Sequence, residues 1–295
     1  MQDDDVRAPT WRPHPRQPAV ALPPLACDAH VHVFGPMARF PFDAGSAIRP
    51  GDAPKEALFA LHRQQGIERC VIVQSLVHGF DNRVVEDAMA AAGGRSLGVA
   101  LAPADVPDAE LVRLAAAGFR GIRFNFMAPR DLAEQPQAVL ALSRRLAPLG
   151  MHLQLQVEGP LIHALAGLID GSAVPVVIDH MGRVDASLGP QHADFAALRA
   201  HLRARPGRTW VKLSGIDRIS RRADYADGIA LARLLADEFP AQCVWGTDWP
   251  HPNHSHIPDD GALVDALAQQ IAPQAEVREQ ILVRNPAALY RFEPG

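Results

Sequence analysis

Short apolar runs recur along the chain, and the segments between them have a different periodicity. The runs are four to nine residues long and rich in β-branched residues, as in Arg69–Leu76 and His152–Val157, which favours buried strands. Eight such runs are present: Leu25–Val33, Arg69–Leu76, Ser96–Leu101, Phe119–Phe124, His152–Val157, Pro175–Ile178, Thr209–Leu213 and Gln242–Gly246. The intervening segments place apolar residues three and four apart, which predicts helices in five of them: Leu58–Gly66, Val106–Gly118, Pro136–Gly150, Leu161–Ile169 and Ala193–Arg205.

Alternating strands and helices predict parallel strands with helices outside them. Several helical segments close on a glycine, as at Gly66, Gly118 and Gly150, the residue that ends helices in the left-handed conformation. Eight strand–helix repeats in 295 residues predict an α/β fold of the (β/α)8 TIM-barrel type, sealed by a last helix near Glu276–Tyr290. The alternative is an open doubly wound sheet, but no Gly-x-Gly-x-x-Gly follows an early strand.

The first 24 residues differ from the rest in being rich in proline and arginine. Proline lacks the amide donor of regular structure, so residues 1–24 are predicted to form an extended arm and residues 25–295 a single barrel domain. The arm could cover its own barrel or clasp a neighbour, which leaves the oligomeric state open.

Composition narrows the class of protein. The net charge of -4, with 29 basic residues spread along the chain, gives no reason to expect a nucleic-acid partner. No run approaches 18 apolar residues, so a membrane span is not expected. Cys27, Cys70 and Cys243 lie in or beside apolar runs without metal-site or disulfide spacing, and Met1–Asp5 lacks the start of a secretory signal. We therefore expect a cytoplasmic protein with reduced, buried cysteines.

Polar residues capable of catalysis stand at the ends of three predicted strands. His30 and His32 end the first, His180 follows the sixth and Asp248 follows the eighth. In a TIM barrel the carboxyl ends of the strands face one pocket, so these four side chains are predicted to meet there. Asp248 is the candidate general base, which takes a proton from water while the three imidazoles orient that water or polarise a carbonyl.

A second group is predicted to bind substrate. Arg123, Arg130 and Arg218 would lie at the barrel mouth, where guanidinium groups pair with the carboxylates of a small acidic ligand. Further strand-end candidates for the pocket wall are Ser75, Gln156 and His251.

A metal ion is the main open question. His30, His32, His180 and Asp248 are a donor set that could hold one divalent cation such as zinc. A two-metal centre needs an acid or a modified lysine on the fourth strand and a histidine on the fifth, where this chain has Arg123 and Gln156. An arginine beside two cations is electrostatically costly, so the sequence predicts one metal ion or none.

Four motifs together resemble the amidohydrolase superfamily, in the branch of lactonases that do not require a metal, and most of all the lactonases that open 2-pyrone-4,6-dicarboxylate. The motifs span nearly the whole chain after the arm: 28–37 (DAHVHVFGPM), 121–126 (GIRFNF), 177–183 (VIDHMGR) and 244–253 (VWGTDWPHPN). The resemblance implies a barrel that hydrolyses a small carboxylated lactone with no required cofactor. It also implies that Asp248 activates water, that His30, His32 and His180 act at the carbonyl, and that Arg123, Arg130 and Arg218 hold carboxylates.

The chain departs from that branch at three positions near the substrate. Ile48, Leu76 and Gln156 stand where those lactonases, as we align them, carry tyrosine, serine and tyrosine. Each lost hydroxyl removes a hydrogen bond worth about 1 kcal/mol, which predicts a changed substrate preference more than a changed reaction. The alternatives are a lactone isomerase of the same branch, a single-metal hydrolase or decarboxylase, and a non-catalytic binding barrel. Analysis of the product would distinguish the isomerase, and analysis of the metal content would distinguish the single-metal enzyme.

Overall fold

A computed structural model describes residues 9–46, 48–127, 135–254 and 256–293 of the chain. Within them, eight parallel strands form one sheet in sequence order from β1 to β8. The strands are β1 (Cys27–Val31), β2 (Arg69–Val73), β3 (Ser96–Leu101), β4 (Phe119–Phe126), β5 (His152–Val157), β6 (Val176–Ile178), β7 (Thr209–Lys212) and β8 (Cys243–Val244). All eight strands predicted from the sequence are therefore confirmed.

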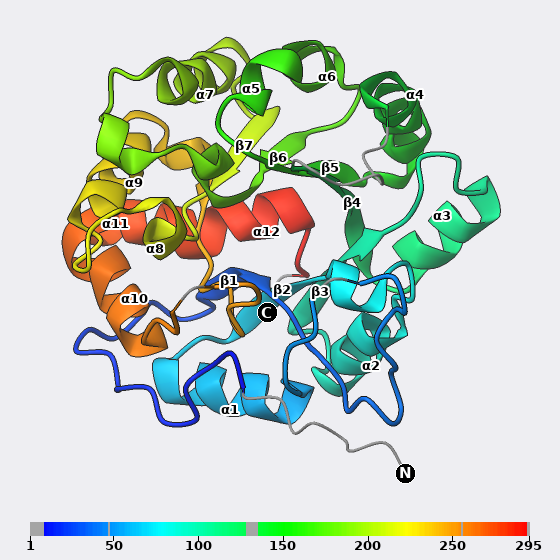
Figure 1. Cartoon of the computed structure of the whole chain (residues 1–295), viewed down its shortest axis with the longest axis horizontal. Helices are drawn as coiled ribbons and strands as arrows, with labels where there is room; N and C mark the ends of the chain where they lie inside the picture. Colours follow the sequence, from blue (N-terminus) through cyan, green and yellow to red (C-terminus); the bar gives the residue numbers. More distant parts are fainter. Residues whose placement is uncertain (1–8, 47, 128–134, 255, 294–295) are drawn as a thin grey trace.

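The sheet curls until its first and last strands meet. Ala29 N donates to Trp245 O at 2.8 Å, and Asp248 N donates to His30 O at 2.9 Å, which joins β1 to the segment after β8. The helices surround this barrel, as Figure 1 shows. They are α1 (Lys55–Gln65), α2 (Arg83–Ala91), α3 (Asp108–Ala116), α4 (Pro136–Leu146), α5 (Leu161–Ala164), α6 (Ala166–Gly171), α7 (Ala193–Ala204), α8 (Ile216–Ile219), α9 (Ala226–Glu238), α10 (Asp260–Ala266), α11 (Ala275–Glu279) and α12 (Asn285–Tyr290). The predicted TIM barrel is confirmed.

The predicted helices agree with the structure in four of five places. Gly66 and Gly150 end their helical segments in the left-handed conformation, at φ 73° and 61°. The predicted helix over Leu161–Ile169 is instead the two short helices α5 and α6, because Leu165 leaves helical geometry between them. None of the helices among the described residues combines the length and apolar character needed to cross a membrane.

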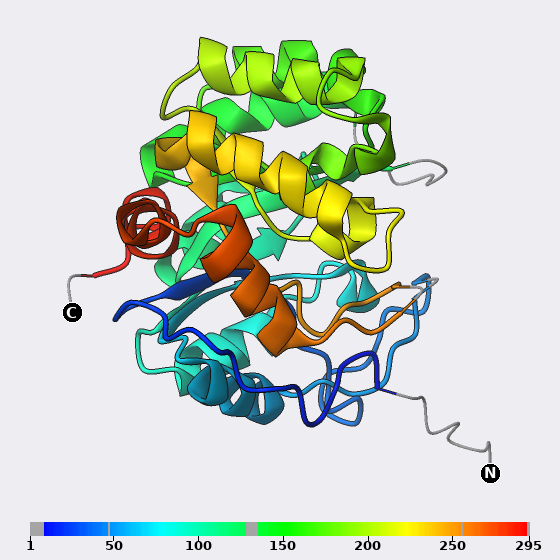
Figure 2. The same ribbon diagram turned by 90° about the vertical axis from the view of Figure 1, so that its left-hand side faces the viewer.

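The amino end of the barrel is closed by the last helix. Figure 2 shows α12 on the side opposite the long loops that follow the strands. Its Tyr290 is fully buried, packs edge to face against His152 with ring centroids 5.5 Å apart, and belongs to an apolar cluster with Cys27, Val99 and Val177 inside the barrel. Side chains therefore fill the interior of the barrel at this end.

Residues 9–24 form neither helix nor strand and lie along the outside of the barrel beside α1 and α10 (Figure 2). Trp11 packs on Trp249 with ring centroids 5.4 Å apart, and Arg16 pairs with Asp265 at 2.7 Å. This part of the arm therefore rests against the loop that carries Asp248.

Candidate active site

A cleft opens at the carboxyl end of the barrel, where TIM-barrel enzymes carry their active sites. Seven of the residues predicted for the site line it: His32, Ser75, Arg123, Gln156, His180, Arg218 and Asp248. His30 lies directly behind them and is fully buried. The sequence positions therefore converge as the barrel prediction requires.

The backbone around Asp248 is held in an uncommon conformation. Asp248 has φ 66°, in the left-handed region that L residues rarely adopt outside functional or over-determined sites. Asp28 fixes the preceding residue, because its carboxylate accepts from Thr247 Oγ1 at 2.6 Å and from Thr247 N at 3.1 Å. Gly246 permits this approach, since a Cβ there would lie 2.6 Å from His30 N. These contacts aim the Asp248 carboxylate into the cleft.

His30 reaches the same place through an irregularity in β1. The pairing of β1 with β2 shifts register between Asp28 and Val31, which is a β-bulge. Asp28 Oδ1 accepts from His30 N at 3.1 Å and so satisfies an amide within the bulge. The strand is therefore irregular at His30, and the rings of His30 and His32 stand nearly perpendicular, 5.0 Å apart.

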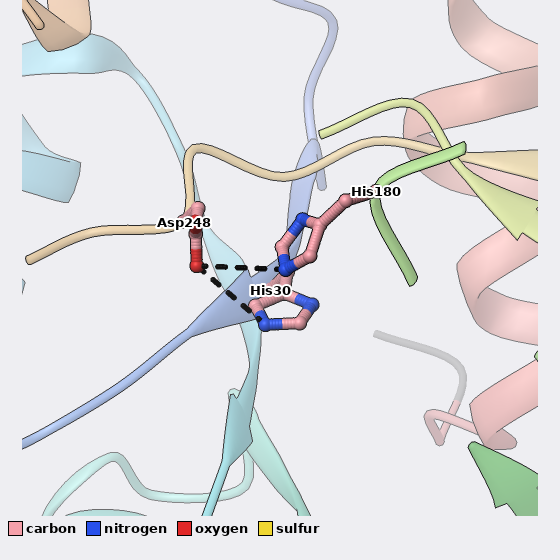
Figure 3. A group of neighbouring side chains, drawn as sticks. All are labelled: His30, His180 and Asp248. Atoms are coloured by element: carbon pink, nitrogen blue, oxygen red, sulfur yellow. Dashed lines mark ion pairs between the residues drawn. The ribbon is translucent and has the colours of Figure 1, made fainter. Parts of the chain in front are cut away.

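Three imidazoles face one oxygen of Asp248. Its Oδ1 lies 3.4 Å from His32 Nε2, 3.7 Å from His30 Nε2 and 4.0 Å from His180 Nε2. Figure 3 shows the rings of His30 and His180 next to each other, each with a nitrogen turned toward this carboxylate. These separations are longer than direct hydrogen bonds, and Oδ1 accepts none among the described residues. A buried carboxylate oxygen without a donor is suited to receive a water molecule, a substrate atom or a cation.

The far nitrogens of these rings define their orientation. His32 Nδ1 lies 2.7 Å from Val73 O and must donate to it, because a carbonyl only accepts. His30 Nδ1 lies 3.3 Å from Asp179 Oδ1, and His180 Nδ1 lies 2.9 Å from Ser214 Oγ. Each ring therefore turns its Nε2 toward Asp248.

The second oxygen of Asp248 is paired with a cation. Arg218 on α8 donates from Nε to Asp248 Oδ2 and from Nη2 to Pro252 O at 3.0 Å. Burial alone would raise the pKa of Asp248, but Arg218 and the surrounding histidines outweigh burial and hold the pKa well below its ordinary value. Asp248 is therefore ionised and ready to accept a proton.

Asp179 anchors the floor of the site. It accepts from Arg123 Nε at 2.9 Å and from Gln154 Nε2 at 3.1 Å, and Lys212 Nζ lies 3.7 Å away. Burial would raise the pKa of Asp179, but His30, Arg123 and Lys212 lower it well below its usual range. Burial lowers the pKa of His30 to about 4, with Lys212 adding to the effect, so this imidazole is neutral at pH 7.

The other predicted substrate-binding residues are placed unequally. Gln156 accepts from Arg123 Nη2 at 2.6 Å at the cleft wall, and Ser75 caps the short helical turn 76–78 through Val77 N at 3.4 Å. His251 is fully buried outside the cleft lining, with Nε2 3.0 Å from Asp260 Oδ1, so the structure gives no support to its predicted substrate contact. Arg130 lies outside the described residues.

Sequence reasoning missed two contributors to the site. Asp179 precedes His180 directly, and a buried carboxylate beside a predicted site histidine was the available signal. Arg183 also lines the cleft. It stands three residues after His180 in a turn where residues 180–183 all have positive φ, so no regular spacing could place its side chain.

A single divalent cation fits this donor set. One nitrogen each of His30 and His180 and one oxygen of Asp248 all lie within 4.8 Å of one another. Ligand atoms on one zinc ion lie about 3.3 Å apart, given zinc–nitrogen distances of about 2.0 Å, so a modest contraction would complete the site. Asp179 and Ser214, on the far nitrogens, would orient the rings as metal-binding histidines require.

Comparison with known proteins finds relatives that are named as hydrolases of lactones. A 2-pyrone-4,6-dicarboxylate hydrolase of Comamonas testosteroni is 39% identical over 95% of this chain and 94% of its own length. A 4-sulfomuconolactone hydrolase of Hydrogenophaga intermedia is 36% identical over 91% of this chain and 89% of its own length. A solved Pseudomonas putida structure, provisionally assigned as a 2-pyrone-4,6-dicarboxylic acid hydrolase, is 29% identical, covers 93% of this chain and 100% of its own, and has a TM-score of 0.81.

The family model described as amidohydrolase matches residues 27–292, which is nearly the whole barrel. Together with a relative 39% identical over most of both chains, this match means that the chain belongs to the amidohydrolase family.

Proposed function

We propose that this protein is a hydrolase that opens a small lactone carrying anionic groups. The observation that supports this most is the Asp248 carboxylate: Oδ2 is held by Arg218, while Oδ1 is buried, has no hydrogen-bond donor among the described residues and faces three imidazole nitrogens. Two relatives named as lactone hydrolases, at 39% and 36% identity, favour the same reaction.

In the proposed reaction a water molecule binds between Asp248 Oδ1 and the imidazoles. Asp248 removes a proton as the water oxygen attacks the lactone carbonyl, and the carbon–oxygen bond of the ring then breaks. The proton on Asp248 passes to the departing ring oxygen, which becomes a hydroxyl group. The new carboxylic acid then releases the remaining proton of the water to solvent and leaves as a carboxylate. His30, His32 and His180 hold the water and stabilise the charge on the carbonyl oxygen.

The arginines of the cleft account for the acidic character of the substrate in this proposal. Arg123 and Arg218 both line the cleft and are mostly buried, where a guanidinium binds a carboxylate strongly. Ile48 and Leu76 line the same cleft and offer no hydrogen-bonding side chain. We therefore infer a substrate that presents an apolar edge to these two residues.

No metal is required in this proposal. If a divalent cation binds, His30, His180 and Asp248 hold it, and it would polarise the lactone carbonyl or acidify the bound water. The residue roles given above for Asp248 and the arginines are the same in either case.

The test is a pH-indicator assay of protein treated with a chelator, against a panel of lactones with one and two anionic groups. The panel includes 2-pyrone-4,6-dicarboxylate, 4-sulfomuconolactone and sugar-acid lactones. Release of one acid equivalent per lactone, lost by at least 1000-fold in Asp248→Asn, is the expected result, because an amide cannot accept the proton.

Asp237→Asn is the matched control, since Asp237 is exposed on α9 and, within the described ranges, pairs only with Arg233. Its activity should equal that of the wild type. Lactone consumption without acid release would indicate an isomerase instead. Substantial turnover by Asp248→Asn would remove the assigned base.

A further inference from the structure

Three arginines line the cleft, and they differ in their partners. Arg123 is bound to Asp179 and Gln156, and Arg218 is bound to Asp248 and the Pro252 carbonyl. Arg183 forms no ion pair with any carboxylate among the described residues. Among the described residues of the cleft lining, its guanidinium is therefore the one without a carboxylate partner.

The surroundings of Arg183 make an unpaired positive charge there energetically unfavourable. The side chain is half-buried, and its Nη1 lies 3.8 Å from the sulfur of Met127, which is a weak acceptor. Burial, reinforced by nearby Arg218, lowers the pKa of Arg183, while Glu158 and Asp248 oppose this effect without pairing with it. A partly desolvated cation without a counter-ion is unfavourable, and an anionic ligand would relieve the cost.

One left-handed turn of the backbone carries both Arg183 and His180 and directs them to the cleft. Residues His180, Met181, Gly182 and Arg183 have φ of 48°, 53°, 67° and 47°, which is one turn of left-handed helix. Each non-glycine residue in this conformation costs about 1 kcal/mol, and such strain persists where the surrounding structure over-determines it. Because both side chains line the cleft, the turn fixes the position of Arg183 relative to the imidazole of His180.

The charges around the cleft indicate how many negative charges the ligand carries. Arg123, Arg183, Arg218 and Lys212 are cations, whereas Asp179 and Asp248 are the carboxylates that contact them. Four cations and two carboxylates leave an excess of two positive charges among these groups. A ligand with two anionic groups would balance the site.

We propose that Arg183 binds the second anionic group, a carboxylate or a sulfonate, of a dianionic substrate whose first anionic group lies against Arg123 and Arg218. This inference rests on the proposed lactone hydrolysis and adds a specificity-determining residue to it. Arg183 would thus make the protein prefer dianionic over monoanionic lactones, whereas Asp248 would act on either.

The first experiment measures binding alone, so that it does not depend on turnover. Calorimetric titration with isophthalate, 3-sulfobenzoate and benzoate compares two flat dianions with a monoanion of the same ring. The wild type is expected to bind at least one dianion ten-fold or more tightly than benzoate. Arg183→Met should remove that preference, and Arg183→Lys should restore part of it, because lysine keeps the charge but not the planar fork.

Arg221→Met is the matched control, since Arg221 is 71% exposed and pairs with Asp185 away from the cleft lining. It should leave the preference unchanged. A preference that survives in Arg183→Met, or that is missing in the wild type, would overturn the proposal. Which dianion binds more tightly distinguishes a carboxylate pocket from a sulfonate pocket.

The second experiment measures kinetics on the lactone panel. Arg183→Met is expected to raise KM for a dianionic lactone 10- to 100-fold, with kcat within about three-fold and little change for a monoanionic lactone. An equal loss for both lactone classes would contradict the assigned role. If the binding preference depends on Arg183 but the wild type opens no lactone, the anion site stands and the proposed hydrolysis fails.

Discussion

Two clusters of histidine and aspartate lie near the barrel mouth and differ in how the charges are matched. The cleft cluster is His30, His32, His180 and Asp248, and the loop cluster is His251, His254, Asp217 and Asp260. In the loop cluster each imidazole has its own carboxylate, at 3.0 Å for His251 and Asp260 and at 2.8 Å for His254 and Asp217. In the cleft cluster three imidazoles share one carboxylate oxygen at 3.4–4.0 Å.

The difference separates a structural use of these residues from a chemical one. The pairs in the loop cluster tie the segment after β8 to α8 and α10, because each carboxylate there lies within 3.0 Å of an imidazole nitrogen. The unmatched oxygen of Asp248 keeps its capacity for a proton or a ligand. Proximity of one histidine to one aspartate is therefore a weaker indicator of catalysis than several imidazoles that converge on a single carboxylate oxygen in a cleft.

The largest expected effect is on the pH dependence of stability, which should have opposite signs in the two clusters. Burial lowers the pKa of His30 to about 4 from 6.5, so His30 contributes stability above pH 6.5 that is lost as pH falls toward 4, about 3 kcal/mol in total. Burial would lower the pKa of His251, but Asp260 outweighs burial and raises it. His251 therefore contributes stability below pH 6.5 that is lost as pH rises through its folded pKa.

Urea unfolding of the wild type, His30→Asn and His251→Asn between pH 4 and 9 measures these contributions. The difference in free energy of unfolding between the wild type and His30→Asn should increase from pH 4 to 6.5. The difference in free energy of unfolding between the wild type and His251→Asn should decrease above pH 6.5. Differences that change in the same direction would show that the two clusters are not electrostatically different.

The next effect is on turnover and compares one histidine from each cluster. His180→Asn should lower kcat about 100-fold, close to 2.7 kcal/mol of activation free energy, because the imidazole faces the reacting carbonyl in the proposed reaction. His254→Asn should change kcat less than three-fold and lower stability instead, since it removes the nearer of the two imidazoles beside the buried Asp217. Steady-state kinetics and thermal unfolding of both variants measure this, and equal kcat losses would remove the distinction.

The sequence predicted the members of the cleft cluster because barrel topology converts strand ends into neighbours. His30, His32, His180 and Asp248 each follow an apolar run, so their convergence required only the correct fold. The eight strands themselves were recognisable because their apolar runs are continuous, as buried parallel strands demand.

The partners of these residues could not be predicted in the same way. Whether His251 faces the cleft depends on Asp260, nine residues later, which holds its ring. The bulge in β1 depends on Asp28 binding Thr247 across the closure of the barrel, and the turn that carries Arg183 is left-handed. These contacts either join residues far apart in the sequence or interrupt the regular geometry of a helix or strand. The spacing of apolar and polar residues within one segment predicts neither.

The smallest expected effect is that of metal removal, and it tests whether the open position in the cleft cluster is used by a cation. Among the described residues, three donor atoms gather within 4.8 Å only at His30, His180 and Asp248, so any bound zinc should be lost in His180→Asn and retained in His254→Asn. Elemental analysis of the purified proteins measures this. Chelation should change wild-type kcat less than two-fold, because Arg218 already orients Asp248 and the imidazoles already face the carbonyl position. A ten-fold loss that zinc restores would make the cation part of the reaction. Zinc that stays bound in His180→Asn but leaves in His254→Asn would instead place it in the loop cluster.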